Sequence, residues 1–313
     1  TLEGDPAFVH CGPFANIAHG NSSIIADSLA LSCSDYVVTE AGFGADMGAE
    51  KALHIKSLAS GKTPDCVVIN VTVRSMKLHG GGFSTGGGKR PPKEELESEN
   101  VDATRKGAAS NLRRHVRNIS MTGLPVVVSI NKFSTDTDAE IQAIADEAKL
   151  AGAKDVVIFR GHAEGGLGAG ELADAVVNAC KKHDESGRQY SPIVESGMSA
   201  RETILKIATN VYGAHNVDFS PEALRSFETL KKWNLDKLPV CMAKTQYSFS
   251  HEAAELGAPT GFTLPIREIR INAGAGFLVT ICGSMMTMPG LPKRPAAMDM
   301  DMDEDGNLMG VFG

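Results

Sequence analysis

The chain has 313 residues, of which 42% are hydrophobic and 22% charged, and its net charge at pH 7 is -7. This composition is typical of a folded α/β protein and excludes a disordered or fibrous chain, while the acidic excess argues against general binding of nucleic acid. No apolar run is long enough to cross a bilayer and no leader peptide opens the sequence, so we expect a cytoplasmic protein without a membrane partner.

Buried strands are predicted where the sequence is continuously apolar and β-branched. Continuous apolarity indicates burial on both faces, as in a parallel sheet. The four runs are residues 35–42 (DYVVTEAG), 65–73 (DCVVINVTV), 125–133 (PVVVSINKF) and 155–159 (DVVIF). Helical patterns accompany them at residues 23–31, 48–59, 93–118 and 137–151. This alternation is the pattern of βαβ units.

The pattern changes after about residue 186. A loop and a helix around residues 212–224 are followed by short strand-like runs in residues 238–250 and 261–283. The predicted fold class is therefore α/β: a parallel sheet of βαβ units, P-loop-NTPase-like or Rossmann-like, with a smaller, β-richer C-terminal domain.

Ligands of such sheets bind at the carboxyl ends of the strands, where four loops are expected. These loops are residues 39–46, 74–82, 131–137 and 160–170. In the third loop, Ser134 and its neighbours are candidates for capping the next helix, but capping does not explain Phe133, whose ring could stack on a planar ligand. In the first loop Phe43 stands between Gly42 and Gly44; whether it contacts a ligand or folds inward stays open.

Two glycine-rich segments resemble nucleotide loops but fail on spacing. In residues 79–92 (HGGGFSTGGGKRPP), Phe83 occupies the position where a Walker loop requires glycine, and Arg90 follows Lys89 where a hydroxyl is required. In AGFGADMG the third glycine of the dinucleotide fingerprint is Met47. The first segment is therefore predicted to be a surface loop.

Metal sites are not predicted. The six cysteines are widely separated, which indicates reduced thiols rather than a zinc site, and no histidine pair has a metal-ligand spacing. DMDEDG (301–306) begins like a calcium loop, but Phe312 stands where a glutamate is required, so an acidic tail is the better interpretation.

Nine segments, taken in order, resemble the formate–tetrahydrofolate ligases. They are GPFANIAHGNSS, VVTEAGFGADMGAEK, VRSMKLHGGG, FSTDTDAE, HAEGGLGAGELA, LPVCMAKTQYSFS, PTGFTLPIREIR, AGAGFLVTICG and MTMPGLPKRPA. The resemblance implies a reaction of purine biosynthesis and one-carbon metabolism: formate is joined to tetrahydrofolate with ATP and Mg²⁺, through a formyl phosphate that the folate amine attacks. It also implies a homo-oligomer and a possible monovalent cation.

The Walker loop of this family is expected upstream of the position that matches Thr1. The chain is therefore expected to be the C-terminal part of the enzyme, with the N-terminal portion as its partner. We predict residues 1–122 as the C-terminal portion of the nucleotide-binding core, 123–220 as a second α/β domain carrying the folate site, and 221–313 as a small α+β domain.

The resemblance also suggests site residues. Phe133, with Ser134 beside it, matches the aromatic on which the family stacks the pteridine of folate. His162, in HAEGG, replaces the tryptophan that closes the other face, and Phe43 matches a further ligand-site phenylalanine. Residues expected near the nucleotide or formyl phosphate are Ala15, Asn16, Gly42, Gly44 and Arg74; Arg74 is expected there from its position in a strand-end loop and not from the resemblance. No catalytic residue is assigned.

Two other functions are weighed. The chain could be a non-catalytic folate-binding or oligomerisation module of a larger protein of one-carbon metabolism. A Rossmann-type dehydrogenase is the weaker alternative, because Met47 breaks its fingerprint.

Overall fold

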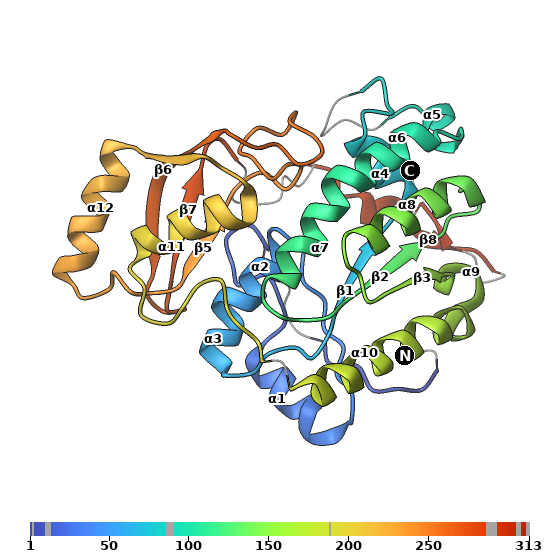
Figure 1. The fold of residues 1–313 in the computed structure, drawn as a ribbon, viewed down its shortest axis with the longest axis horizontal. Helices are drawn as coiled ribbons and strands as arrows, with labels where there is room; N and C mark the ends of the chain where they lie inside the picture. The colour runs from blue at the N-terminus through green and yellow to red at the C-terminus, as the bar shows by residue number, and fades with distance from the viewer. Residues whose placement is uncertain are drawn as a thin grey trace.

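The computed structural model describes residues 1, 3–9, 14–85, 91–187, 189–285, 293–304 and 308–310. It forms two lobes that lie side by side (Figure 1). The first lobe is built on a three-stranded sheet of order β1-β2-β3, and the second lobe on a four-stranded sheet of order β4-β6-β7-β5.

Both strand pairs of the first sheet are parallel. In Figure 1, α10 lies on one side of this sheet, and α4, α6, α7 and α8 lie on the other. With η denoting a 3-10 or π turn, the elements of this part are α1 (Ile24–Cys33), α2 (Gly48–Lys51), η1 (Ala52–Lys56), α3 (Ser57–Ser60), β1 (Val67–Val71), α4 (Val73–His79), α5 (Lys93–Glu97), α6 (Val101–Gly107), η2 (Ala108–Leu112), α7 (Arg113–Ser120), β2 (Val126–Asn131), α8 (Asp138–Leu150), β3 (Asp155–Phe159), α9 (Gly161–Glu164), η3 (Gly165–Ala169) and α10 (Gly170–Ser186).

The central strand β2 shows why its sequence is continuously apolar. Val128 and Ile130 belong to a core cluster that includes Ile144 of α8. Val127, which points to the opposite face, packs in a separate cluster with Ala179 of α10. Because helices cover both faces, no position of the strand is left for a polar residue on a solvent side.

The second sheet is mixed. β4 runs parallel to β6, β5 runs parallel to β7, and β6 and β7 form an antiparallel hairpin. The elements here are α11 (Ala200–Ile207), η4 (Ala208–Tyr212), β4 (Asn216–Phe219), α12 (Pro221–Lys232), β5 (Val240–Ala243), β6 (Thr263–Asn272) and β7 (Phe277–Cys282), followed by η5 (Ala296–Asp299), β8 (Asp301–Met302) and β9 (Leu308–Met309).

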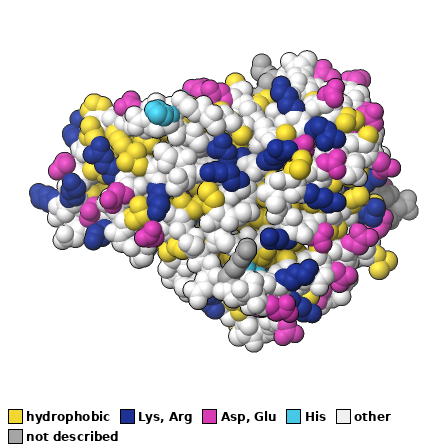
Figure 2. All heavy atoms as spheres, in the orientation of Figure 1, with side chains coloured by type: hydrophobic (Ala, Val, Ile, Leu, Met, Phe, Trp, Pro, Cys, Tyr) yellow, Lys and Arg dark blue, Asp and Glu magenta, His cyan; other side chains and the backbone are white. Residues whose placement is uncertain are grey.

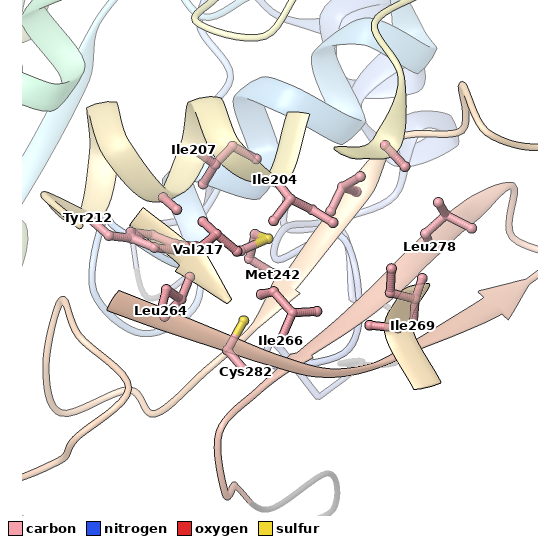
Figure 3. Close-up of a cluster of buried hydrophobic side chains, with 14 of the residues drawn as sticks. Ile204, Ile207, Tyr212, Val217, Met242, Leu264, Ile266, Ile269, Leu278 and Cys282 are labelled. Carbon is pink, nitrogen blue, oxygen red and sulfur yellow. The ribbon is translucent and has the colours of Figure 1, made fainter. Parts of the chain in front are cut away.

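The core of the second lobe lies between this sheet and α11. Figure 3 shows Ile204 and Ile207 of α11 directed toward Met242 and Ile266 of the sheet. This cluster extends from Val194 to Cys282, so it crosses residue 220; the domain boundaries proposed from the sequence stay predictions. The other face of the sheet packs against Ile55 of η1.

The predicted α/β class, with a parallel sheet and a second, β-richer part, is confirmed. Three of the four predicted strands are β1, β2 and β3, and the helix predicted at residues 137–151 is α8. Its start is set by a capping box, because the Thr137 hydroxyl accepts from the Glu140 N–H and the Glu140 side chain accepts from the Thr137 N–H.

The strand predicted at residues 35–42 was wrong. No strand pairs with this segment among the described residues, and Val38 is 92% exposed. Its polar groups bind the loop before α1 instead: the Asn21 amide donates to the Glu40 carbonyl at 2.9 Å, and the Gly42 N–H donates to the Gly20 carbonyl at 2.9 Å. Without a neighbouring strand, apolar β-branched sequence does not make a sheet.

The loop predicted at residues 74–82 was also wrong, because residues 73–79 form α4. The Thr72 hydroxyl accepts from the Ser75 N–H at 3.1 Å, and the Ser75 hydroxyl lies 3.3 Å from the Thr72 nitrogen, so a capping box starts a helix directly after β1.

The single helix predicted at residues 93–118 is broken between α5 and α6. The Asn100 side chain accepts from the Ala103 N–H at 3.0 Å and starts α6 afresh. The carbonyl of Ser98, freed by the break, accepts from the buried Lys77 ammonium at 2.7 Å.

The surface of the protein carries charged side chains of both signs. Acidic and basic side chains are interspersed over the face shown in Figure 2. Within the described part of the chain, no helix is long and apolar enough to span a membrane. Residues 86–90 of the glycine-rich segment, Cys11, and residues 305–306 of the acidic segment lie outside the described residues.

Candidate functional site

The carboxyl ends of β1, β2 and β3 lie at one edge of the first sheet, because the three strands are parallel. The residues that follow these ends are Arg74 in the first turn of α4, Phe133 in the loop after β2, and His162 in α9. The sheet topology therefore gathers three of the residues expected at a ligand site at a single edge.

A tight turn presents Phe133 at this edge. The Phe133 N–H donates to Oδ2 of Asp136 at 2.8 Å, and the Asp136 N–H donates back to the Phe133 carbonyl at 3.1 Å. Thr137 then caps α8. Phe133 is only partly buried.

The Arg74 guanidinium lies over the Phe133 ring, with Cζ 4.4 Å from the ring centroid. This is cation–π geometry. Among the described residues Arg74 makes no salt bridge, although its Nε is buried and has no hydrogen-bond partner. Arg74 was expected near a phosphate and Phe133 near folate, but in the structure the Arg74 guanidinium lies over the Phe133 ring.

The Asp136 carboxylate is only half satisfied. The residue is 7% exposed, and its second carboxylate oxygen, Oδ1, is buried without a partner. Burial raises the pKa of Asp136, and Glu140 raises it further, although the Phe133 N–H and the charge of Arg74 oppose the shift. Thr135 Oγ1 is likewise buried without a partner.

A buried ion pair lies beneath this turn. The Lys77 ammonium is 2.8 Å from Oε1 of Glu140, and both side chains are almost wholly buried. Glu140 also accepts from the Asn100 N–H at 2.8 Å and from the Thr137 N–H at 3.2 Å. Burial raises the pKa of Glu140, but the hydrogen bond from Lys77, together with those from the Asn100 and Thr137 N–H groups, lowers it by more, so the carboxylate stays ionised below its ordinary range.

His162 lies on an exposed turn of α9. No ring contact between it and Phe133 is present within the described parts of the chain. The neighbouring Gly166 N–H donates to Oε1 of Glu3 at 2.8 Å, so the first residues of the chain reach the same loop. The edge of the sheet is therefore open at the end of β3, where the His162 imidazole is exposed to solvent.

Phe43 belongs to a second group of residues. Its ring is 47% exposed and meets Phe14 edge-on at a centroid distance of 6.0 Å. Its φ of 60° lies in the left-handed region, which a phenylalanine rarely adopts and which is often found at functional sites. The neighbouring Gly42 is required because a Cβ there would lie 2.9 Å from the Cβ of Ala15.

This glycine loop is anchored in the second lobe. Asp46, buried at the end of the loop, accepts from the Lys244 ammonium at 2.6 Å. Lys244 is fully buried and also donates to the carbonyls of Thr245 and Ser248. Burial raises the pKa of Asp46, but the Lys244 charge, with that of His115, lowers it by more. Gly44 lies directly against this pair, because a Cβ there would be 2.6 Å from Oδ1 of Asp46.

Comparison with known proteins agrees with the segments quoted above. A family model for formate–tetrahydrofolate ligase matches residues 1–312. The chain belongs to the formate–tetrahydrofolate ligase family.

Curated relatives carry the same description. Formate–tetrahydrofolate ligase of Paracoccus denitrificans is 50% identical over 312 residues, which is 100% of this chain and 54% of the relative. The Roseiflexus enzyme is 49% identical over 311 residues, with 99% of this chain and 54% of the relative covered, and that of Desulforamulus reducens is 48% identical over 312 residues. The chain spans about half the length of these relatives.

Three features of this ligase-family chain were not predicted from its sequence. The stacking of Arg74 on Phe133 depends on α4, which was expected to be a loop. The sequence around Asp136 predicts a helix cap, and this pattern does not indicate that one carboxylate oxygen lacks a hydrogen-bond partner. The sequence could have predicted an ion pair at Lys244, because burial of a lysine at the end of an apolar strand costs free energy unless the ammonium group is paired.

The sequence contains no segment with the residue spacing of a phosphate-binding loop. Gly61-Lys62-Thr63 supplies a Gly-Lys-Thr triplet, but Lys56 stands where the first glycine is required. Gly61 moreover ends α3 in a left-handed conformation instead of opening a helix. Within the described residues, no cluster of three or more histidine, cysteine or acidic side chains could hold a metal ion.

Proposed function

We propose that this chain supplies the tetrahydrofolate side of an ATP-dependent formate–tetrahydrofolate ligase. The observation that carries the proposal is Phe133, a partly exposed ring at the carboxyl edge of a parallel sheet, in a chain of this family. In the proposed reaction the folate amine attacks a formyl phosphate, a C–N bond forms, and phosphate leaves. Such a transfer needs an oriented amine and a stabilised oxyanion, which positioning and charge can supply without a protein nucleophile.

The proposed folate site consists of Phe133, Ser134, His162 and Phe43. Phe133 supports the pteridine ring, and His162, exposed in α9, is proposed to contact the same ring. Ala15, Asn16, Gly42 and Gly44 are proposed for the formyl phosphate side, whereas Arg74, which was also expected there, lies over the Phe133 ring. The described residues offer neither a phosphate loop nor a metal cluster, so we assign none of them to ATP, Mg²⁺ or a monovalent cation.

A partner for the chain is proposed from its exposed apolar side chains. Val9, Ile25 and Val38 are 96%, 82% and 92% exposed, and all three lie in the first 40 residues. Exposed apolar surface marks an interface where it gathers into a patch. We propose that the portion of the ligase that this chain does not span covers it; the alternative occupant is a second copy, in a homo-oligomer. A cytoplasmic location is proposed because the described cysteines are free thiols.

The test combines binding and turnover. Titration calorimetry should show that the 313-residue chain binds tetrahydrofolate while showing no formate-dependent release of ADP. Addition of the uncovered portion of the Paracoccus denitrificans enzyme as a separate chain should restore that release. Folate binding without any restored turnover would favour the non-catalytic module, and NADH binding without folate binding would favour a dehydrogenase.

A further inference from the structure

The Phe133 turn contains polar atoms that the protein itself leaves unsatisfied. Arg74 Nε can only donate a hydrogen bond, Asp136 Oδ1 can only accept when ionised, and Thr135 Oγ1 can do either. All three are buried and without a partner within the described residues. Buried polar atoms are nearly always paired in folded proteins, so three around a single turn require an explanation.

Local geometry holds the Asp136 carboxylate in one orientation. Its Oδ2 accepts from the Phe133 N–H at 2.8 Å, which leaves Oδ1 directed away from that bond. The nearby cations do not satisfy Oδ1. Lys77 is committed to Glu140 at 2.8 Å and to the Ser98 carbonyl at 2.7 Å, while the Arg74 guanidinium lies over the Phe133 ring.

Arg74 is the movable part of this arrangement. Within the described parts of the chain no hydrogen bond or salt bridge holds its guanidinium, and its stacking on Phe133 is of a kind that contributes only about 0.5–2 kcal/mol. A planar ligand that stacks on the same ring can displace it at small cost. The displaced guanidinium remains beside the turn, where it can donate to the ligand.

We propose that Asp136 and Arg74 recognise the 2-amino-4-oxo edge of the pterin ring that stacks on Phe133. Asp136 Oδ1 accepts from the ring N3–H and the 2-amino group, and Arg74 donates to the 4-oxo oxygen. This edge carries two adjacent donors beside one acceptor, which complements one acceptor beside one donor on the protein. The inference rests on the proposed function, because it assumes that the ligand of Phe133 is a folate.

The direct test compares two ligands by titration calorimetry with the 313-residue chain. The first is tetrahydrofolate, and the second is the analogue in which a methyl group replaces the 2-amino group. The wild-type chain should bind tetrahydrofolate about 10- to 100-fold more tightly, the range expected for a hydrogen bond to a charged group. In Asp136→Asn the amide oxygen can still accept from the Phe133 N–H, but an NH₂ group then faces the ligand, so the preference should fall below about threefold.

Asp138→Asn is the matched control. Asp138 lies two residues away at the start of α8, and its side chain is 97% exposed. This variant should keep the wild-type preference. Tetrahydrofolate affinity of the wild type should also fall as the pH is lowered through the raised pKa of Asp136, and that fall should be absent in Asp136→Asn.

The possible outcomes separate the two proposals. Equal affinity of the wild type for both ligands would overturn edge recognition and leave folate binding intact, and this comparison requires no variant to fold. An equal loss for both ligands in Asp136→Asn would mean that Asp136 only shapes the turn, and would also overturn it. Binding of neither ligand by the wild type would overturn the proposed function and this inference together.

Discussion

Replacement of Lys77 by methionine should destabilise the first lobe strongly. The substitution keeps most of the side-chain volume but leaves Glu140 as a buried carboxylate without its cation. It also removes the donor to the Ser98 carbonyl, which the break between α5 and α6 leaves free. Removal of one partner from a buried ion pair costs about 3–5 kcal/mol, which is a large fraction of the stability of an ordinary domain.

The double variant Lys77→Met/Glu140→Gln tests whether the unpaired charge of Glu140 causes this loss of stability. The Asn100 N–H donates to Oε1 of Glu140 and the Thr137 N–H donates to Oε2, so the single amide oxygen that Glu140→Gln introduces can keep one of these two hydrogen bonds. The amide carries no charge that would be left unpaired. We expect the double variant to recover about 1–3 kcal/mol relative to Lys77→Met alone. The pair Lys93–Glu97, 3.8 Å apart with Lys93 79% exposed, supplies the control: Lys93→Met should change the stability by less than about 0.5 kcal/mol.

Urea unfolding at pH 7 and pH 4 provides the assay. The pKa of Glu140 is lowered on folding, so the stability it contributes is fully present above its unfolded value of 4.5 and is lost as the pH falls through the folded value. The difference between wild type and Lys77→Met should therefore shrink below pH 4.5. A loss under about 1 kcal/mol for Lys77→Met at pH 7, or a double variant no more stable than the single one, would refute this account.

Three further outcomes are expected. Phe133→Ala should weaken tetrahydrofolate binding by about 1–3 kcal/mol in calorimetry, whereas Phe219→Ala, which removes a ring stacked under Arg201 at 5.4 Å in the second lobe, should leave it unchanged; the reverse result would place the ligand elsewhere. His162→Trp should tighten the same binding because indole offers more stacking area, and weaker binding would indicate a specific polar contact of the imidazole. Burial lowers the pKa of His79 from 6.5 to about 4, so about 3 kcal/mol of stability present above pH 6.5 should be lost as the pH falls toward 4; His79→Gln should remove this dependence, and an unchanged urea midpoint of the wild type over that range would contradict it.

Local sequence rules succeeded where a single interaction decides the structure. α8 begins where Thr137 and Glu140 form a capping box, and β2 is continuously apolar because helices cover both its faces. The strand-like runs predicted within residues 261–283 are β6 and β7. In each case the signal and the structure that it determines lie within a few residues of each other.

The same rules failed where a distant residue decides the structure. Residues 35–42 have the composition of a strand, but strand formation depends on a neighbour, and the loop at Asn21 is what they bind. The helix break at residues 98–100 is stabilised by Lys77, which lies 21 residues away from Ser98. The stacking of Arg74 on Phe133 joins two strand ends whose proximity follows only from sheet order. The edge of the sheet at which the site is proposed could be predicted from the sequence, whereas the contacts between its residues required the fold.

The buried bond between Asp46 and Lys244 has a consequence for how the protein is made. The two residues are 198 positions apart in the chain. At a synthesis rate of about 5–20 residues per second, Asp46 leaves the ribosome about 10–40 s before Lys244 does. During that interval the carboxylate has to stay hydrated, so the glycine loop around Phe43 cannot reach its final position. The first lobe is therefore expected to complete its folding only after translation has passed β5.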